Sequence, residues 1–125
     1  MPAPVTLLLV DDDDSIRRLI ARNLEEEGYH VLQAASATHA LQIWEAAKHE
    51  IALVISDIRM PGTTGDQLAS RLTRAPAVPP ILFISGYGQE GLWLPGPLLP
   101  KPFQLDALST EVKRLLRGEN EAAVA

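Results

Sequence analysis

Short apolar runs alternate with amphipathic stretches along this 125-residue chain. The runs lack the polar alternation of a half-exposed strand, which is typical of strands buried on both faces of a sheet. They predict five strands, at residues 5–10, 29–34, 51–57, 81–85 and 98–99. Apolar residues at helical spacing predict helices over 15–27, from 36 to near 48, from 64 or 65 onward, and over 104–117.

The alternation of strands and helices favours right-handed βαβ units, and therefore an α/β fold with helices on both faces of a parallel sheet. The length and the 46% of hydrophobic residues fit a single folded domain. We expect its core over 5–117 and a flexible tail over 118–125. Segment 86–97 contains four glycines and two prolines, so a fourth helix there should be absent or shortened to about one turn.

Charge and composition exclude several classes of function. The net charge of -5 opposes non-specific contact with nucleic acid, and the absence of cysteine excludes disulfides, thiol catalysis and zinc–thiolate sites. No apolar run approaches the roughly 20 residues that cross a bilayer, and the start of the chain lacks the pattern of a signal peptide. We therefore expect a cytoplasmic protein without membrane insertion or direct nucleic-acid binding.

Polar residues stand where the predicted strands end. Asp11 and Asp12 follow the first strand, Asp57 ends the third, Ser85 ends the fourth, and Lys101 follows the fifth. Ligands of parallel α/β sheets bind at the carboxyl ends of the strands, which meet at one edge. Three acids, a hydroxyl and an ammonium should therefore converge there.

This set of residues suits phosphoryl chemistry. Three adjacent carboxylates repel one another, and a hard divalent cation such as Mg²⁺ relieves the repulsion and bridges to phosphate oxygens. Asp57 can then act as the nucleophile toward a phosphoryl group, while Lys101 and Ser85 hold its other oxygens. Taken singly, each residue has a plainer interpretation as a loop acid, a cap, a turn hydroxyl or an exposed cation. Their conjunction on four strand ends favours the site.

The motifs that carry these residues resemble one family. They are Leu9–Asp12, Ser56–Pro61 followed by Gly65, Ile84–Tyr87, and Lys101–Phe103. In this order they resemble the response-regulator receiver domain of two-component signalling, over essentially residues 5–117. The resemblance implies a flavodoxin-like, doubly wound sheet of five parallel strands in the order 2-1-3-4-5.

The resemblance also implies roles for the site residues. Asp57 would be the phosphoacceptor, and its donor a phosphohistidine on a sensor histidine kinase or phosphotransfer protein. Asp12, Asp57 and the backbone carbonyl of Arg59 would bind Mg²⁺ (or Mn²⁺) directly, with Asp11 acting mostly through water. Ser85 and Lys101 would contact the phosphoryl group, and the Lys101–Pro102 peptide would be cis.

The same resemblance describes a switch rather than a turnover enzyme. Such a domain assists its own phosphorylation and dephosphorylation, and phosphorylation changes its contacts with a downstream partner or a second copy. Arg59 and Tyr87 stand two positions after Asp57 and Ser85, where the family tunes hydrolysis, and both are bulky. We expect them to shield the phosphoryl group from water.

Two features bear on partners. Arg17 and Arg18 on the first helix are either a solvated face or a contact for the kinase, which docks on this helix in the family. The shortened segment resembles receivers of hybrid kinases, and Leu98 stands where the family usually has a switch aromatic. Leu92, Trp93 and Leu94 form an apolar cluster that either covers the core edge or is a partner surface, to which Leu98 would also belong.

Two other functions compete with this interpretation. The first is a phosphorylation-independent interaction domain that keeps the receiver fold, which the complete set of acids, hydroxyl and lysine disfavours. The second is a hydrolase of the haloacid-dehalogenase type, which also uses a nucleophilic Asp and magnesium. That class needs a second acid two residues after the nucleophile, where this chain has Arg59.

Overall fold

A single parallel sheet forms the centre of the molecule. The computed structural model describes residues 4–74, 78–86 and 94–118. Its strands are β1 (Thr6–Val10), β2 (His30–Ala34), β3 (Ile51–Asp57), β4 (Ile81–Ser85) and β5 (Leu98–Pro100). They pair in parallel in the order β2-β1-β3-β4-β5, which confirms the predicted flavodoxin-like topology.

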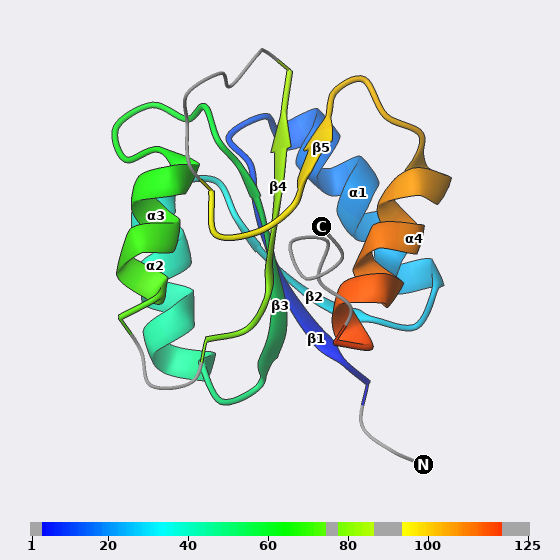
Figure 1. Ribbon diagram of the computed structural model, residues 1–125, viewed down its shortest axis with the longest axis horizontal. Coiled ribbons are helices and arrows are strands. Elements are labelled where there is room, and N and C mark those ends of the chain that lie inside the picture. Colours follow the sequence, from blue (N-terminus) through cyan, green and yellow to red (C-terminus); the bar gives the residue numbers. More distant parts are fainter. Residues whose placement is uncertain (1–3, 75–77, 87–93, 119–125) are drawn as a thin grey trace.

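Four helices cover the two faces of this sheet within the described ranges. They are α1 (Asp14–Glu26), α2 (Ala37–Ala47), α3 (Gly65–Leu72) and α4 (Leu105–Leu116). Figure 1 shows α2 and α3 on one face and α1 and α4 on the other. None of these helices is long and apolar enough to cross a membrane.

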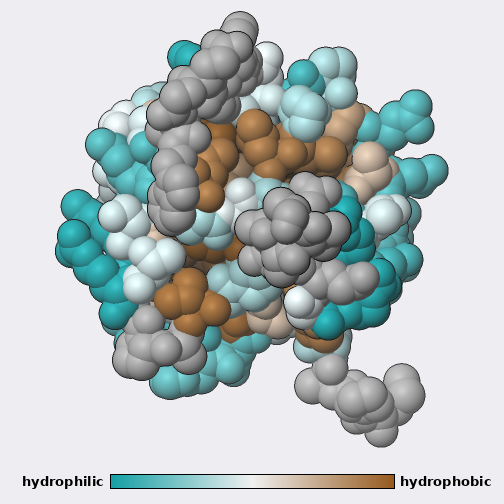
Figure 2. All heavy atoms as spheres, in the orientation of Figure 1, coloured by the Kyte–Doolittle hydropathy of each residue, from teal (hydrophilic) through white to brown (hydrophobic). Residues whose placement is uncertain are grey.

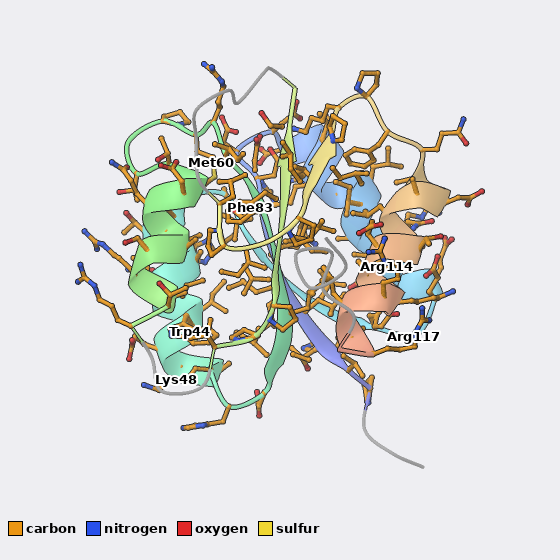
Figure 3. All side chains as sticks on the ribbon, viewed as in Figure 1. Trp44, Lys48, Met60, Phe83, Arg114 and Arg117 are labelled. Atoms are coloured by element: carbon orange, nitrogen blue, oxygen red, sulfur yellow. The ribbon has the colours of Figure 1, made fainter. Side chains whose placement is uncertain are left out.

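The central strands are buried on both faces, as their continuous apolar runs predict. Leu7 and Leu9 of β1 pack toward α1 and α4, whereas Leu8 and Val10 pack toward α2 and α3, and all four are 0% exposed. The cluster on the α2 and α3 side includes Trp44, Met60 and Phe83, which are labelled in Figure 3. Successive side chains of one strand therefore belong to two separate cores.

Gly65 allows α3 to begin directly against the end of β3. Its N–H donates to the Ile58 carbonyl at 2.8 Å. A Cβ at position 65 would overlap the backbone carbonyl of Asp57, so a larger residue would push the helix away from the strand. The start of α3 thus fixes the loop that follows Asp57.

The segment between β4 and β5 lies close to the sheet where it is described. Residues 86 and 94–97 contain no helix, and the rest of the predicted helix-free segment, with Tyr87, Leu92 and Trp93, lies outside the described residues. Leu94 packs against the core on the α2 and α3 side, which confirms a core-covering role for this residue. The Phe83 N–H donates to the Pro97 carbonyl at 2.9 Å, so the chain enters β5 beside β4.

Candidate functional site

The strand register brings the predicted site residues to one edge of the sheet. Val10 of β1 lies opposite Ser56 of β3, so the next residues, Asp11 and Asp57, are neighbours across the two strands. Lys101 follows β5, and its N–H donates to the Ser85 carbonyl at 2.7 Å. The Lys101 backbone is therefore anchored at the end of β4, and its side chain reaches across to the acids.

Lys101 bridges two buried carboxylates. Its ammonium lies 3.3 Å from Asp11 Oδ2 and 3.2 Å from Asp57 Oδ2. Backbone donors occupy the other oxygens: the Asp13 N–H donates to Asp11 Oδ1 at 2.9 Å, and the Arg59 N–H donates to Asp57 Oδ1 at 3.3 Å. Since Asp11 is 0% and Asp57 is 6% exposed, the bridge lies in a largely desolvated environment.

The raised pKa of Asp11 indicates that Lys101 only partly offsets the cost of burying this charge. Burial raises the pKa of Asp11, and the nearby Asp57 charge adds to the rise, against the opposing effects of the Asp13 N–H and Lys101. Burial alone would lower the pKa of Lys101, but the charges and hydrogen bonds of Asp11 and Asp57 outweigh it and raise that pKa. Lys101 is therefore cationic at neutral pH.

Three acids have the arrangement of a metal site. One carboxylate oxygen from each of Asp11, Asp12 and Asp57 lies within 4.8 Å of the others. These hard oxygen donors fit Mg²⁺, which binds through one or two carboxylates and keeps several waters. Asp12 is exposed, unlike the other two acids, so the site opens to solvent on its side.

The remaining candidates have different surroundings. Ser85 ends β4 and is 2% exposed. Arg59 is an exposed residue, and its backbone N–H donates to Asp57. Leu98 begins β5 and is 38% exposed, whereas Tyr87 is not among the described residues.

The run of four aspartates divides into two pairs. Asp13 is the N-cap of α1 and accepts a hydrogen bond from the Ile16 N–H at 3.1 Å, and Asp14 is the first helical residue. Acids at these positions stabilise a helix N-terminus. Asp11 and Asp12 are thus the two acids of the run that belong to the sheet edge.

The alternative that places Arg17 on a solvated face of the first helix is wrong. Arg17 is 8% exposed, and its guanidinium donates to the Asp11 carbonyl at 2.9 Å and to Gln33 Oε1 at 3.2 Å. It also forms an ion pair with Asp14 Oδ1 at 2.8 Å. The spacing of Asp14 and Arg17 could have indicated their pair, but nothing in the sequence singled out Gln33. Only Arg18 of the two arginines is exposed, so partner contact remains a prediction for Arg18.

An apolar groove that sequence reasoning missed lies between α1 and the loop before α4. It has a volume of about 470 Å³, and its lining includes Ile16, Leu19, Ile20, Pro102, Phe103 and Leu105. Leu19 belongs to the apolar face of α1 by spacing, yet it is 56% exposed. On the face seen in Figure 2, hydrophobic residues gather around the upper end of β5, next to the loop that leads to α4.

Comparison with known proteins identifies relatives of this chain. A family model described as "Response regulator receiver domain" matches residues 7–94. The Sensor kinase CckA of Brucella abortus is 37% identical over 121 residues, which are 92% of this chain and 13% of that protein. Response regulator Rre1 of Synechocystis sp. is 35% identical over 135 residues, covering 100% of this chain and 57% of that protein.

Two solved structures share the fold. The receiver domain from the hybrid histidine kinase CckA superposes with a TM-score of 0.78 at 39% identity, covering 89% of this chain and 98% of that one. Response regulator protein TrrA from Thermotoga maritima, solved in complex with Mg²⁺ and BeF, has a TM-score of 0.79 at 32% identity, covering 88% and 97%. The likeness to CckA supports the predicted resemblance to receivers of hybrid kinases.

We predict that Asp11→Asn stabilises the fold at neutral pH in metal-free buffer. Because the folded state raises the pKa of Asp11, it disfavours the charged carboxylate, and an amide removes that cost while keeping an acceptor for the Asp13 N–H. The free energy of unfolding in urea should rise by more than the ~0.5 kcal/mol typical of surface substitutions.

The pH dependence provides the sign check for this prediction. As the pH falls toward the ordinary value of 3.8, wild-type Asp11 takes up a proton and the advantage of the variant should shrink. Glu50→Gln, at an exposed acid in the turn before β3, is the control and should change stability little. A loss of stability in Asp11→Asn at neutral pH would mean that the pair with Lys101 outweighs the burial cost.

Proposed function

This chain belongs to the response regulator receiver-domain family, and on that premise we propose that Asp57 accepts a phosphoryl group from a phosphohistidine. Receiver domains interact with histidine kinases or phosphotransfer proteins and are not turnover enzymes for an external substrate. The observation that carries the proposal is the Lys101 ammonium between Asp11 and Asp57, beside a third acid at the same sheet edge.

The transfer requires one bond to form and one to break. A carboxylate oxygen of Asp57 forms the new P–O bond, the P–N bond of the donor breaks, and its electron pair returns to the imidazole nitrogen. Asp11, Asp12, Asp57 and the Arg59 carbonyl would hold Mg²⁺, or Mn²⁺, which would offset negative charge on the transferring group. The complex of the related TrrA with Mg²⁺ and BeF supports the use of this metal.

Two other residues would bind the acyl phosphate that results. The Lys101 ammonium already contacts Asp57 Oδ2, and its raised pKa keeps it positively charged, so it can pair with a phosphoryl oxygen. Ser85 stands at the end of the adjacent strand β4, and its hydroxyl would donate to another phosphoryl oxygen. Loss of the phosphoryl group to water, assisted by the same site, would reset the switch.

The apolar groove beside α1 suits the donor. Gly86 and Lys101 also line it, so it runs up to the phosphoacceptor edge. An amphipathic helix that buries its apolar side chains in the groove, next to exposed Leu19, would carry its phosphohistidine to Asp57. The exposed Arg18 of α1 would contact the polar side of this partner helix.

The wider setting is a proposal as well. The chain spans only 13% of the sensor kinase CckA and 57% of Rre1, so it corresponds to part of those proteins. We infer a module of the hybrid-kinase type that receives a phosphoryl group within a relay. Leu92, Trp93 and the exposed Leu98 would form the surface that a downstream protein reads.

We predict that Asp57→Asn abolishes phosphorylation. Incubation of the wild-type protein with acetyl phosphate and Mg²⁺ should add the mass of one phosphoryl group, since a carboxylate forms an acyl phosphate and an amide does not. Chelation of the metal should suppress the wild-type reaction. Asp106→Asn, at an exposed acid, should be phosphorylated normally. If wild-type protein with Mg²⁺ gains no phosphoryl group on Asp57, a phosphorylation-independent interaction domain is the better description.

We predict that Leu19→Asn weakens transfer from a protein donor only. It places an amide in the apolar groove, so kcat/KM with a phosphorylated histidine kinase should fall about tenfold, equivalent to about 1.4 kcal/mol. The rate with acetyl phosphate should stay unchanged because that donor needs no groove. Val5→Asn, at an exposed residue before β1, is the matched control. Equal losses with both donors would contradict docking in the groove.

We predict that Arg59→Ala and Tyr87→Ala shorten the lifetime of the phosphorylated protein. The Arg59 N–H donates to Asp57 Oδ1, so its side chain starts beside the acyl phosphate and can exclude water. Loss of phosphate after removal of the donor should be several-fold faster than in the wild type. Arg18→Ala removes an exposed arginine elsewhere and should decay at the wild-type rate. Identical decay in all four proteins would refute shielding.

A further inference from the structure

One arginine joins three parts of the chain beneath the acidic edge. Arg17 is 8% exposed, although arginine is rarely buried unless it is paired. Its guanidinium donates to the carbonyl of Asp11 after β1 and to Gln33 in β2, and it forms an ion pair with Asp14 in α1. These three contacts use the planar guanidinium, which a lysine ammonium cannot reproduce.

The hydrogen bond from Arg17 to the Asp11 carbonyl fixes the peptide group that precedes the Cα of Asp12. That carbonyl belongs to the planar peptide group that links residues 11 and 12, so its direction also sets the Asp12 N–H and Cα. The Asp11 N–H is itself fixed by the Ala34 carbonyl at 3.1 Å. Because hydrogen bonds hold both the N–H and the carbonyl of Asp11, the backbone conformation that leads into Asp12 is fixed.

Asp12 depends on this backbone for its position. No side-chain hydrogen bond or ion pair holds its carboxylate within residues 4–74, 78–86 and 94–118, whereas Asp11 and Asp57 are each held at both oxygens. Yet the Asp12 carboxylate lies within 4.8 Å of those of Asp11 and Asp57. The peptide plane that Arg17 fixes therefore determines where the Asp12 carboxylate lies, since this acid has the fewest side-chain contacts of the three.

We propose that Arg17 is a positioning residue for the metal site, which aims Asp12 toward the ion and is itself held by Gln33. This inference rests on the proposed use of a divalent cation by the domain. It assigns to Gln33, the second-last residue of β2, an indirect effect on metal affinity. Such supporting contacts typically change metal affinity by about 10- to 100-fold when they are removed.

Charge and positioning predict opposite effects, which makes the inference testable. Arg17 is a cation near the acids, so by charge alone its removal should tighten Mg²⁺ binding. If Arg17 acts by aiming Asp12, its removal should weaken binding instead. The side chain of lysine keeps the charge and loses the planar guanidinium, so Arg17→Lys separates the two effects as well.

The experiment measures the Kd of Mg²⁺ alone by calorimetry and by amide chemical shifts in NMR, without any phosphoryl donor. Arg17→Met should raise the Kd about tenfold and Arg17→Lys nearly as much, while Gln33→Met should raise it less. Arg22→Met removes an exposed arginine of the same helix α1 and should leave the Kd unchanged. Far-UV circular dichroism and dispersed amide spectra establish that each variant is folded.

The outcomes separate this inference from the proposed function. Unchanged or tighter Mg²⁺ binding in Arg17→Met, or a wild-type Kd in Arg17→Lys, would overturn the positioning role while the metal site stands. If Arg17→Met does not fold, Arg17→Lys and Gln33→Met decide, and wild-type affinity in both contradicts the inference. Wild-type protein that binds no Mg²⁺ would overturn the metal site, and with it this inference.

Discussion

The contact of one ammonium with two buried carboxylates is the constraint around which this edge of the sheet is built. Asp11 and Asp57 end neighbouring strands and are almost completely buried, so their charges repel in a region that water screens poorly. Lys101 follows β5, which lies two strands away from β3 and its Asp57, and its ammonium offsets this repulsion. Without Lys101 both buried acids would lose their cation, which is strongly destabilising, so β5 must end where it brings Lys101 to both acids.

The balance that Lys101 provides is incomplete. The pKa of Asp11 stays raised despite the bridge, because burial and Asp57 outweigh the lysine and the Asp13 N–H. One positive charge faces two buried acids, with a third acid within 4.8 Å. A divalent ion coordinated by these carboxylate oxygens would supply the missing positive charge. The local electrostatic cost in the metal-free fold is therefore of the kind that functional sites retain at the expense of stability.

Most of the fold and the principal acids follow from sequence because both depend on local patterns. Continuous apolar runs give the strands, and parallel strands carry Asp11, Asp57 and Lys101 to one edge whatever the details of packing. The exposure of Leu19 and the burial of Arg17 depend instead on how α1 is rotated against β2 and α4, which spacing within one helix does not determine. Gln33 was missed for the same reason, since its partner lies 16 residues away in the chain.

The aspartate run shows how four identical residues acquire separate roles at one turn. Asp13 caps α1, Asp14 pairs with Arg17, Asp11 faces Lys101, and Asp12 is left exposed beside Asp11 and Asp57. Positive charge meets the run from three directions: the N-terminus of α1, the Arg17 guanidinium and the Lys101 ammonium. Each of these is committed to an acid or a carbonyl other than the Asp12 carboxylate. Among the residues that the structure describes, the acid of this run without a cation of its own at the sheet edge is thus Asp12, which faces solvent, where a metal ion can enter.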